Sequence, residues 1–446
     1  MKANLELEEI QRLDAAFASE PRNRLALNAV TQSDASAVAL NREVVSQIDH
    51  TYSHLIETPE ATNQKSSGRC WLFAGLNTLR LLAMKEMNVE RFELSQSYLM
   101  FWDKLEKSNF FLESIIETVD EPLDGRLVQW LLANLVSDGG QWDMFVNLIE
   151  KYGVVPKSVM LETNSSSKSG LMNAALTAKL REDARDLRQL HGEGESAEAL
   201  RQAKGRMMED LYAMLCIHLG KPPSSFVWEW RDKDKAFHRH EGPITPRGFF
   251  EKYVGADLDD MVCLIHAPTQ DKPYRKMYTV QYLGNVVGGH PVRYLNVDIE
   301  PLKQATAEMI VDGQVVWFGC DVGKSMEREL GVLDPAIYDY ELLYGTPFNL
   351  DKAARLDYGH SRMTHAMVLT GVDLDGSGKP IKWRVENSWG TERGDKGYML
   401  MSDSWFDEYV YEVAVSRRFL SADLLAVLDT EPVVLPPWDP MGALAR

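Results

Sequence analysis

The chain has 446 residues, of which 45% are apolar and 26% are charged, a composition typical of a globular protein with a large core. Acidic residues outnumber basic ones by 66 to 48, and the net charge of −18 argues against a general affinity for nucleic acid or for an anionic membrane. Four widely spaced cysteines, no apolar run of about 18 residues and a charged N-terminal stretch without a signal-peptide pattern together predict a cytoplasmic protein.

Apolar residues at helical spacing predict a mainly helical first half of the chain. Residues 5–20 have the pattern of an amphipathic helix, and residues 21–63 are expected to form an irregular lead-in. Ser95 is a candidate N-cap because it directly precedes a helical run. The helices expected after the lead-in span residues 71–87, 94–117, 123–135 and 144–152.

Two charged helical runs, residues 171–190 and 197–219, follow a Ser-rich break and predict an antiparallel helical hairpin. A pair of helices packed on the core is one interpretation. The other is a projecting arm that binds a second subunit, and the high charge of both helices favours this arm slightly.

From about residue 244 the pattern changes to strands and short helices, with strands expected at 277–280 and 315–318. The run 319–325 contains Gly, Lys and Ser but has three residues between its glycines instead of the four of a phosphate loop, so we reject a nucleotide site. His238 and His240 lack partners at metal-ligand spacing and are expected to be solvated.

Cys70 lies where the polar loop 64–69 meets a helical run, and therefore at a helix N-terminus. The unpaired N–H groups and the helix dipole favour an anion there, which predicts a lowered pKa and a reactive thiolate. Arg69 adds a positive charge, and the amide of Gln64 together with the Cys70 N–H would form an oxyanion hole. A lone cysteine at a helix start is more often simply a small buried residue.

A second cluster favours catalysis over that alternative. Residues 366–372 and 381–387 are β-like runs on either side of a strong turn at 373–378, so they predict a hairpin. His365 and Asn387 are equidistant from the turn and should face each other, which would let the Asn387 amide accept from one ring nitrogen of His365. The other nitrogen would pair with Cys70, which completes a Cys-His-Asn triad, and Trp389 would shield the Asn–His bond.

With these residues the chain resembles the papain-type cysteine peptidases. Gln64, Cys70-Trp71, His365-Ala366 and the run 387–390 match that family's motifs in order. Gly139 and Gly140, which by themselves indicate only a turn, resemble the glycine pair that lines the family's substrate cleft. His365 follows Cys70 by 295 residues instead of the roughly 130–150 of papain and cathepsins, so about 150 residues are inserted.

The enlarged form resembles the branch of bleomycin hydrolase and bacterial aminopeptidase C. The resemblance runs nearly end to end and includes 139–144, 316–324, 363–367, 383–390, 405–413 and 437–445. It implies a cytoplasmic, homohexameric aminopeptidase of broad specificity whose active sites face an internal cavity. It also implies hydrolysis of bleomycin-type amides and homocysteine thiolactone, without a cofactor or a metal.

The expected fold is therefore α+β and papain-like, with a helical lobe, a β-barrel-like lobe and an inserted helical hairpin. We divide the chain into a helical lobe carrying the nucleophile (1–163), the hairpin as oligomerisation arm (164–243), a β-rich lobe carrying His365 and Asn387 (244–430), and a C-terminal arm (431–446).

The Pro-rich composition of 431–446 is by itself typical of a disordered tail. The resemblance implies instead that this arm lies in the cleft beside Gly139, Gly140 and Trp389, where a terminal carboxylate on Ala445 pairs with the substrate's α-ammonium. Self-trimming in the family predicts that Arg446 is removed.

The alternatives are a papain-like endopeptidase and a nucleic-acid-binding or scaffold protein with a peptidase fold. The acidic charge weighs against nucleic-acid binding, and the complete set of four catalytic residue types weighs against a scaffold. Peptides with a free N-terminus are the expected partners, and no membrane partner is expected.

Overall fold

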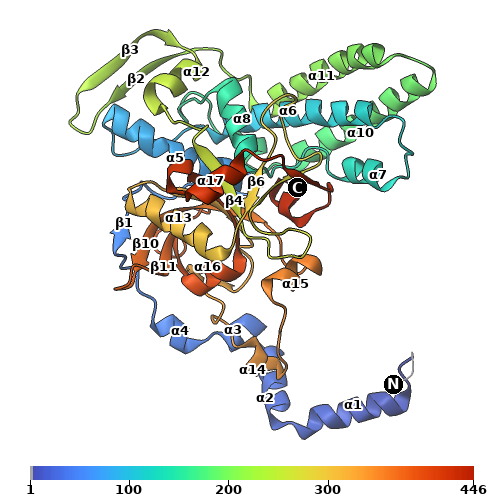
Figure 1. Cartoon of the computed structure of the whole chain (residues 1–446), viewed down its shortest axis with the longest axis vertical. Helices are drawn as coiled ribbons and strands as arrows, with labels where there is room; N and C mark the ends of the chain where they lie inside the picture. Colours follow the sequence, from blue (N-terminus) through green and yellow to red (C-terminus); the bar gives the residue numbers. More distant parts are fainter. Residues whose placement is uncertain (1–3, 446) are drawn as a thin grey trace.

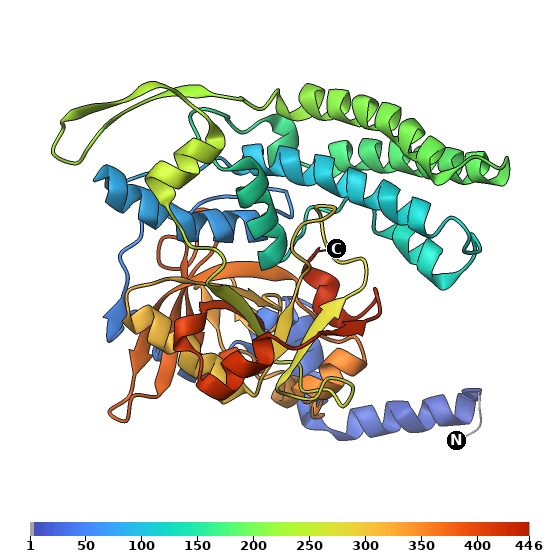
Figure 2. The same ribbon diagram turned by 45° about the horizontal axis from the view of Figure 1, so that its top comes forward.

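The computed structural model describes residues 4–445 and has a layer of helices packed on a large sheet (Figures 1 and 2). The helical layer contains α5 (Cys70–Met87), α6 (Gln96–Glu117), α7 (Arg126–Ala133), α8 (Trp142–Tyr152), α9 (Asn164–Ser167), α10 (Gly170–Gly192) and α11 (Ala197–Leu219). These bounds confirm the predicted helices to within a few residues. Ser95 caps α6 as expected, because its hydroxyl accepts from the Tyr98 N–H at 3.1 Å.

Helix α5 is the central element of this layer. Apolar residues occupy nearly all of its faces, and most of its side chains are buried against α6, α8 and the sheet. A helix surrounded in this way is held by packing on every side, so its N-terminal end is fixed in position.

The hairpin of α10 and α11 lies along α6 and packs on it through buried leucines of both helices (Figure 1). Leu171 and Ile217, in contrast, are 85% and 81% exposed. The interpretation as a core-packed pair therefore describes most of the hairpin, and its role as an oligomerisation arm stays a prediction.

The second half of the chain forms one mixed sheet with the order β14-β5-β6-β4-β13-β7-β10-β11-β12-β9-β8, to which β1 is added on β10. Its strands are β1 (His54–Leu55), β4 (Met261–Ile265), β5 (Lys276–Val280), β6 (Tyr294–Asn296), β7 (Val316–Cys320), β8 (Met326–Glu327), β9 (Val332–Leu333), β10 (His365–Leu374), β11 (Pro380–Glu386), β12 (Tyr398–Ser402), β13 (Val410–Ser416) and β14 (Val433–Leu435). The predicted strands at 277–280, 315–318, 366–372 and 381–387 are confirmed.

Short helices connect or cover these strands. They are α12 (Pro246–Phe249), the π-helix η1 (Phe250–Val254), α13 (Ile299–Val311), α14 (Tyr340–Tyr344), α15 (Lys352–Asp357), α16 (Asp403–Tyr409), the 3₁₀ turn η2 (Arg417–Phe419), α17 (Ala422–Leu428) and the 3₁₀ segment η3 (Pro440–Ala445). Strand β7 leads through a turn to β8 instead of a helix, which agrees with the rejection of a phosphate loop.

Two regions differ from the expectation. The lead-in is not irregular throughout, because α1 (Leu7–Ser19) is followed by α2 (Pro21–Val30), α3 (Ala35–Ala39) and α4 (Arg42–Ser46). After the hairpin, β2 (Phe226–Arg231) and β3 (Phe237–Ile244) form a separate two-stranded ribbon inside the region predicted as helical hairpin. Aromatic residues Trp228 and Trp230 hold this ribbon on Phe249 and Tyr253.

None of the helices within residues 4–445 is both long enough and apolar enough to span a membrane.

Candidate active site

Cys70 is the first residue of α5, as predicted, and is 4% exposed. The N–H groups of Ala366 and Trp71 point at its thiol and favour the anion, but burial outweighs them and raises the pKa of Cys70 to about 11. The expected low pKa of an isolated helix-terminal thiol is therefore wrong for this site. The thiol is neutral here, and a thiolate requires a base that takes its proton.

Arg69 does not contribute the free positive charge that the sequence suggested. Its guanidinium forms two hydrogen bonds with the Glu162 carboxylate, at 3.0 and 2.8 Å, and a third with the Ser67 hydroxyl at 2.9 Å. Because this ion pair is largely buried, the Glu162 carboxylate cancels most of the positive potential that Arg69 would otherwise produce at Cys70.

Gln64 joins the nucleophile loop to the segment after β11. Its side-chain N–H donates to the Ser67 carbonyl and its side-chain oxygen accepts from the Ser388 hydroxyl, each at 2.6 Å. Its backbone N–H donates to the Ser388 carbonyl at 2.8 Å. A primary amide has two N–H bonds, so one remains for an oxyanion beside the Cys70 N–H.

His365 begins β10, and its Nε2 lies 2.9 Å from the Asn387 side-chain oxygen. An amide oxygen only accepts, so Nε2 carries the proton and Nδ1 is the basic nitrogen. Trp389 covers the imidazole with ring centroids 5.0 Å apart. Burial lowers the pKa of His365 to about 4, against the opposing effect of the bond to Asn387.

The strand register differs from the symmetric hairpin that the sequence suggested. Val368 pairs with Glu386, and irregularities at Leu369/Gly371 and Asp373/Leu374 displace the register. Asn387 therefore lies beyond the end of the ladder and does not pair with His365 through the backbone. The two residues meet through their side chains alone.

The packing of α5 on β10 brings Cys70 to the start of β10, the strand that begins with His365. The Ala366 N–H, one residue after His365, lies against the Cys70 thiol. Nearby, the Trp317 indole of β7 donates to the Trp71 carbonyl at 3.3 Å. Residues from the two halves of the chain are thus assembled at one junction of helix and sheet.

A buried ion pair that sequence reasoning missed fastens the same junction. Arg80 on α5 pairs with Glu386, the neighbour of Asn387, and both side chains are at most 3% exposed. The Asn77 side chain donates to the same carboxylate at 2.8 Å. Burial nevertheless raises the pKa of Glu386 to about 7. Its position directly before Asn387 was the only signal available in the sequence.

Gly139 and Gly140 need to be glycine for different reasons. A Cβ on Gly140 would overlap the Trp71 indole, and a Cβ on Gly139 would overlap the carbonyl oxygen of Leu444. The buried lysines of α6, Lys104 and Lys107, hold this loop through the carbonyls of residues 136, 137 and 139.

The C-terminal segment 440–445 therefore runs along the glycine pair, between the helical layer and the sheet (Figure 2). Tyr294 and Gln141 donate to the Met441 carbonyl at 3.2 and 3.3 Å, and the Ser137 hydroxyl donates to the carbonyl of Ala445. Residues 440–445 are thus ordered by contacts with both halves of the chain instead of forming a disordered tail. The predicted removal of Arg446 lies outside the described residues.

Two contacts anchor the approach to this segment, and neither was foreseen. Lys272 and Asp439 form an ion pair at 3.0 Å in which both side chains are at most 4% exposed. The Arg126 guanidinium lies 3.7 Å from the centre of the Trp438 ring. Trp438 and Asp439 belong to the Pro-Trp-Asp-Pro run, but their partners are distant in sequence.

Glu150, Asp259 and His290 form the one group within residues 4–445 whose side chains lie close enough together to hold a metal ion. Asp259 and His290 are exposed, and His290 is already bonded to Glu150 at 2.9 Å. The group comes from different elements than Cys70, His365 and Asn387.

Glu412 on β13 is expected to make the free energy of unfolding depend on pH. Its carboxyl group is buried beside the Cys263 thiol, and burial, with the nearby Asp143 charge, outweighs the effect of that thiol and raises the pKa of Glu412 from 4.5 to about 8. A raised folded-state pKa contributes stability below pH 4.5 that is lost as the pH rises to 8. Glu412→Gln is therefore expected to gain roughly 2–4 kcal/mol relative to wild type between pH 5 and pH 8, measured by urea unfolding.

The exposed Glu90 provides the matched control for this substitution. Glu90→Gln should change the free energy of unfolding by the same amount at pH 5 and at pH 8. A difference between the wild-type and Glu412→Gln proteins that stays constant from pH 5 to pH 8 would contradict a protonated Glu412.

The comparisons with known proteins agree over the whole chain. Residues 4–442 match the model of the Peptidase C1-like family. Bleomycin hydrolase of Rattus norvegicus is 47% identical over 452 residues, which cover 99% of each chain. Aminopeptidase C of Streptococcus thermophilus is 47% identical over 435 residues, 98% of each chain. The crystal structure of PepW from Lactobacillus rhamnosis shares 48% identity, covers 99% of each chain and has a TM-score of 0.97.

These relatives confirm the resemblance to the bleomycin hydrolase and aminopeptidase C branch, and with it the papain-like peptidase fold. The enlarged length of this chain is shared by these relatives, because each comparison covers at least 98% of both chains. The chain belongs to the Peptidase C1-like family.

Proposed function

We propose that this protein is a cytoplasmic cysteine aminopeptidase of broad specificity that releases N-terminal residues from peptides. The observation that carries this proposal is the position of the segment 440–445 in the groove beside Gly139, in a chain whose relatives include aminopeptidases. A groove filled from one side leaves room for little more than the first residue of a peptide.

In the proposed mechanism, His365 Nδ1 takes the proton of Cys70 and the thiolate attacks the carbonyl carbon of the first residue. Gln64 and the Cys70 N–H donate to the oxyanion. His365, held by Asn387, returns the proton to the leaving amine as the C–N bond breaks. Water, deprotonated by His365, then hydrolyses the thioester and restores the thiol.

The opposed pKa values of Cys70 and His365 fit a proton transfer that accompanies attack. Burial raises the pKa of Cys70 and lowers the pKa of His365, and both directions favour the uncharged forms of the two groups before substrate binds. A negative charge then arises on sulfur only when a carbonyl is in place to receive it.

Selection of a free N-terminus is assigned to the C-terminal segment. Removal of Arg446 would leave a carboxylate on Ala445, which would pair with the substrate's α-ammonium in a partly dry groove. Acyl transfer to Cys70 would also accommodate bleomycin-type amides, for which relatives such as that of Rattus norvegicus are named, and homocysteine thiolactone, a more reactive acyl compound.

We also propose a homohexamer. The support is apolar surface: Leu171 and Ile217 on the hairpin are strongly exposed, and no residue of α1 is buried although Ile10, Leu13 and Phe17 share one face. Native mass spectrometry tests this directly.

The function is tested with pairs of peptides that differ only in N-terminal acetylation. Turnover of the free amine with at least tenfold preference over the acetylated peptide is expected, since an uncharged N-terminus loses a charge-assisted bond worth about 1.5–3 kcal/mol. Equal turnover would favour an endopeptidase. Absence of turnover with a salt-dependent gel shift would favour a nucleic-acid-binding protein.

Deleting residues 440–446 is expected to remove this preference and to raise cleavage of acetylated peptides by at least tenfold, because the groove beside Gly139 is opened. Mass spectrometry of the fragments reads the cleavage positions. The substitution Leu425→Ser on exposed α17 serves as a control for a change of surface without a change in the groove. A truncated protein that still rejects acetylated peptides would contradict the assigned role of the segment.

A further inference from the structure

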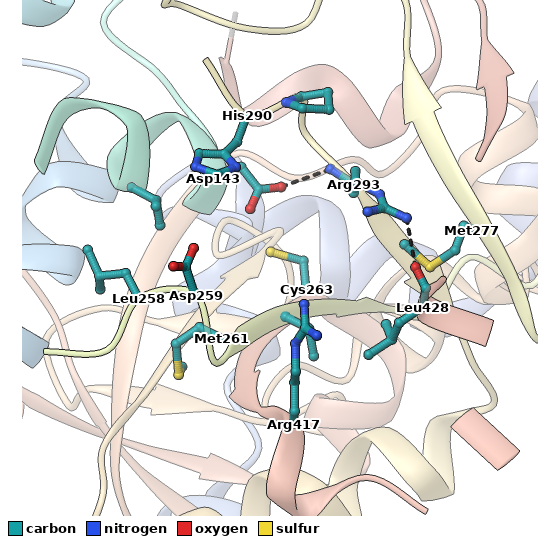
Figure 3. Close-up of a pocket in the computed structure, with 13 residues that line it drawn as sticks. Asp143, Leu258, Asp259, Met261, Cys263, Met277, His290, Arg293, Arg417 and Leu428 are labelled. Atoms are coloured by element: carbon teal, nitrogen blue, oxygen red, sulfur yellow. Dashed lines mark hydrogen bonds between the residues drawn. The ribbon is translucent and has the colours of Figure 1, made fainter. Parts of the chain in front are cut away.

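A second cavity, of about 200 Å³, lies between α8, β4, β5 and the segment before β6, with none of Cys70, His365 or Asn387 in its lining (Figure 3). It is smaller than the 300–1,000 Å³ of most sites for drug-sized ligands, so its occupant is a small molecule. Carboxylates and guanidinium groups both face it, which is unusual for a pocket that serves packing alone.

The cationic side of the cavity is formed by Arg417 and Arg293. Within residues 4–445, Arg417 makes no ion pair or side-chain hydrogen bond, and Figure 3 shows its side chain extending toward Cys263. One terminal nitrogen of Arg293 donates a hydrogen bond to the Leu428 carbonyl at 2.7 Å. The Nε of Arg293 is buried and has no hydrogen-bond partner within residues 4–445. These groups leave donors for a carboxylate.

The anionic side is formed by Asp143 and Asp259. One oxygen of Asp143 accepts from the Arg293 backbone N–H at 2.8 Å, and the carboxyl group otherwise faces the cavity (Figure 3). Asp259 projects into the cavity from the loop before β4 (Figure 3). His290 lies beside them and is engaged by Glu150.

The two sets of charges exclude most ligand classes. Asp143 and Asp259 would repel a phosphate or other polyanion, and the two arginines would repel a simple cation. A ligand with one charge of each sign satisfies both sides. The remaining lining is apolar, from Val146, Met277 and Leu428 among others, and it suits an aliphatic side chain.

We propose that this cavity binds a free α-amino acid with an aliphatic side chain, with its carboxylate on Arg417 and Arg293 and its ammonium on Asp143 and Asp259. The assignment rests on the chemistry of the cavity. The proposed aminopeptidase reaction would supply such molecules as products, and the first turn of α8, which carries Asp143, directly follows the glycine pair of the groove.

The test is isothermal titration calorimetry on the full-length Cys70→Ser protein, which prevents turnover of the ligands. L-leucine is the probe, and L-leucinamide and N-acetyl-L-leucine lack one charge each. We expect L-leucine to bind at least tenfold more tightly than either analogue, and Arg417→Gln and Asp143→Asn each to weaken it at least tenfold. Arg418→Gln is the matched control, because this neighbouring arginine pairs with Asp312 outside the cavity.

Arg417→Gln in the otherwise wild-type protein should keep its kcat/KM on free-amine peptides, which separates this cavity from the groove. Leucine affinity that is unchanged in both Arg417→Gln and Asp143→Asn would overturn the proposal, as would an absence of binding at ~10 mM or binding of inorganic phosphate in place of leucine. A protein that binds leucine through Arg417 and has no peptidase activity would refute only the proposed function.

Discussion

Cys70→Ser is expected to lower kcat/KM on free-amine peptides by about 10³-fold to 10⁶-fold. The proposed reaction depends on sulfur, because a thiol gives up its proton far more readily than an alcohol and its anion is intrinsically more nucleophilic. The base proposed for it is weak, because burial lowers the pKa of His365 to about 4. Such an imidazole can accept a proton from a thiol during attack but has little power to activate a serine hydroxyl.

Steady-state kinetics and urea unfolding of the same preparation separate chemistry from folding. Serine is nearly isosteric with cysteine and retains the Ala366 N–H as a partner, so the free energy of unfolding should change by no more than about 1.5 kcal/mol. Cys216→Ser, at the half-buried thiol of α11, is the matched control and should keep wild-type activity. Wild-type turnover by Cys70→Ser would remove Cys70 from the mechanism.

Local features of this chain could be predicted from sequence because their signals are local. The helix that begins at Cys70 follows from apolar spacing after a polar loop, and Ser95 caps α6 through a bond to a residue only three positions away. The side-chain contact between His365 and Asn387 was also foreseen. The backbone register that produces it was not, because β-bulges are not encoded in a symmetric pattern around a turn.

Features that depend on distant partners were missed. The charge of Arg69 is compensated by Glu162, 93 residues away, and the pKa of Cys70 is set by burial that only the assembled fold provides. The order of the C-terminal segment likewise comes from Lys272, which is 167 residues from Asp439. The composition of the segment is typical of a disordered tail, but the partners that order it, and the 3₁₀ helix at its end, are a tertiary property.

Arg80→Met is expected to destabilise the protein by about 3–5 kcal/mol at pH 8, because it leaves the Glu386 carboxylate buried without its counter-ion. The loss should shrink at acidic pH. The pKa of Glu386 is raised to about 7 from 4.5 in the folded protein. Protonation of this carboxyl therefore stabilises the folded state at low pH, and this stabilisation is lost as the pH rises from 4.5 through 7. At pH 5 the folded protein holds the carboxyl protonated. Urea unfolding at pH 5 and pH 8 measures both effects.

Two further variants decide whether the ion pair or the bulk of Arg80 is responsible. Arg91→Met breaks the exposed pair with Glu60, in which the side chains are 79% and 70% exposed, and should cost less than about 1 kcal/mol. In the double variant Arg80→Met/Glu386→Gln the uncompensated charge is gone, so most of the lost stability should return. The part of the pH dependence that comes from Glu386 should disappear as well. Glu386 directly precedes Asn387. Recovery of stability without recovery of kcat would therefore indicate that the ion pair also positions Asn387 relative to His365. A loss for Arg80→Met that is equal at both pH values would mean that packing, and not charge, joins α5 to β11.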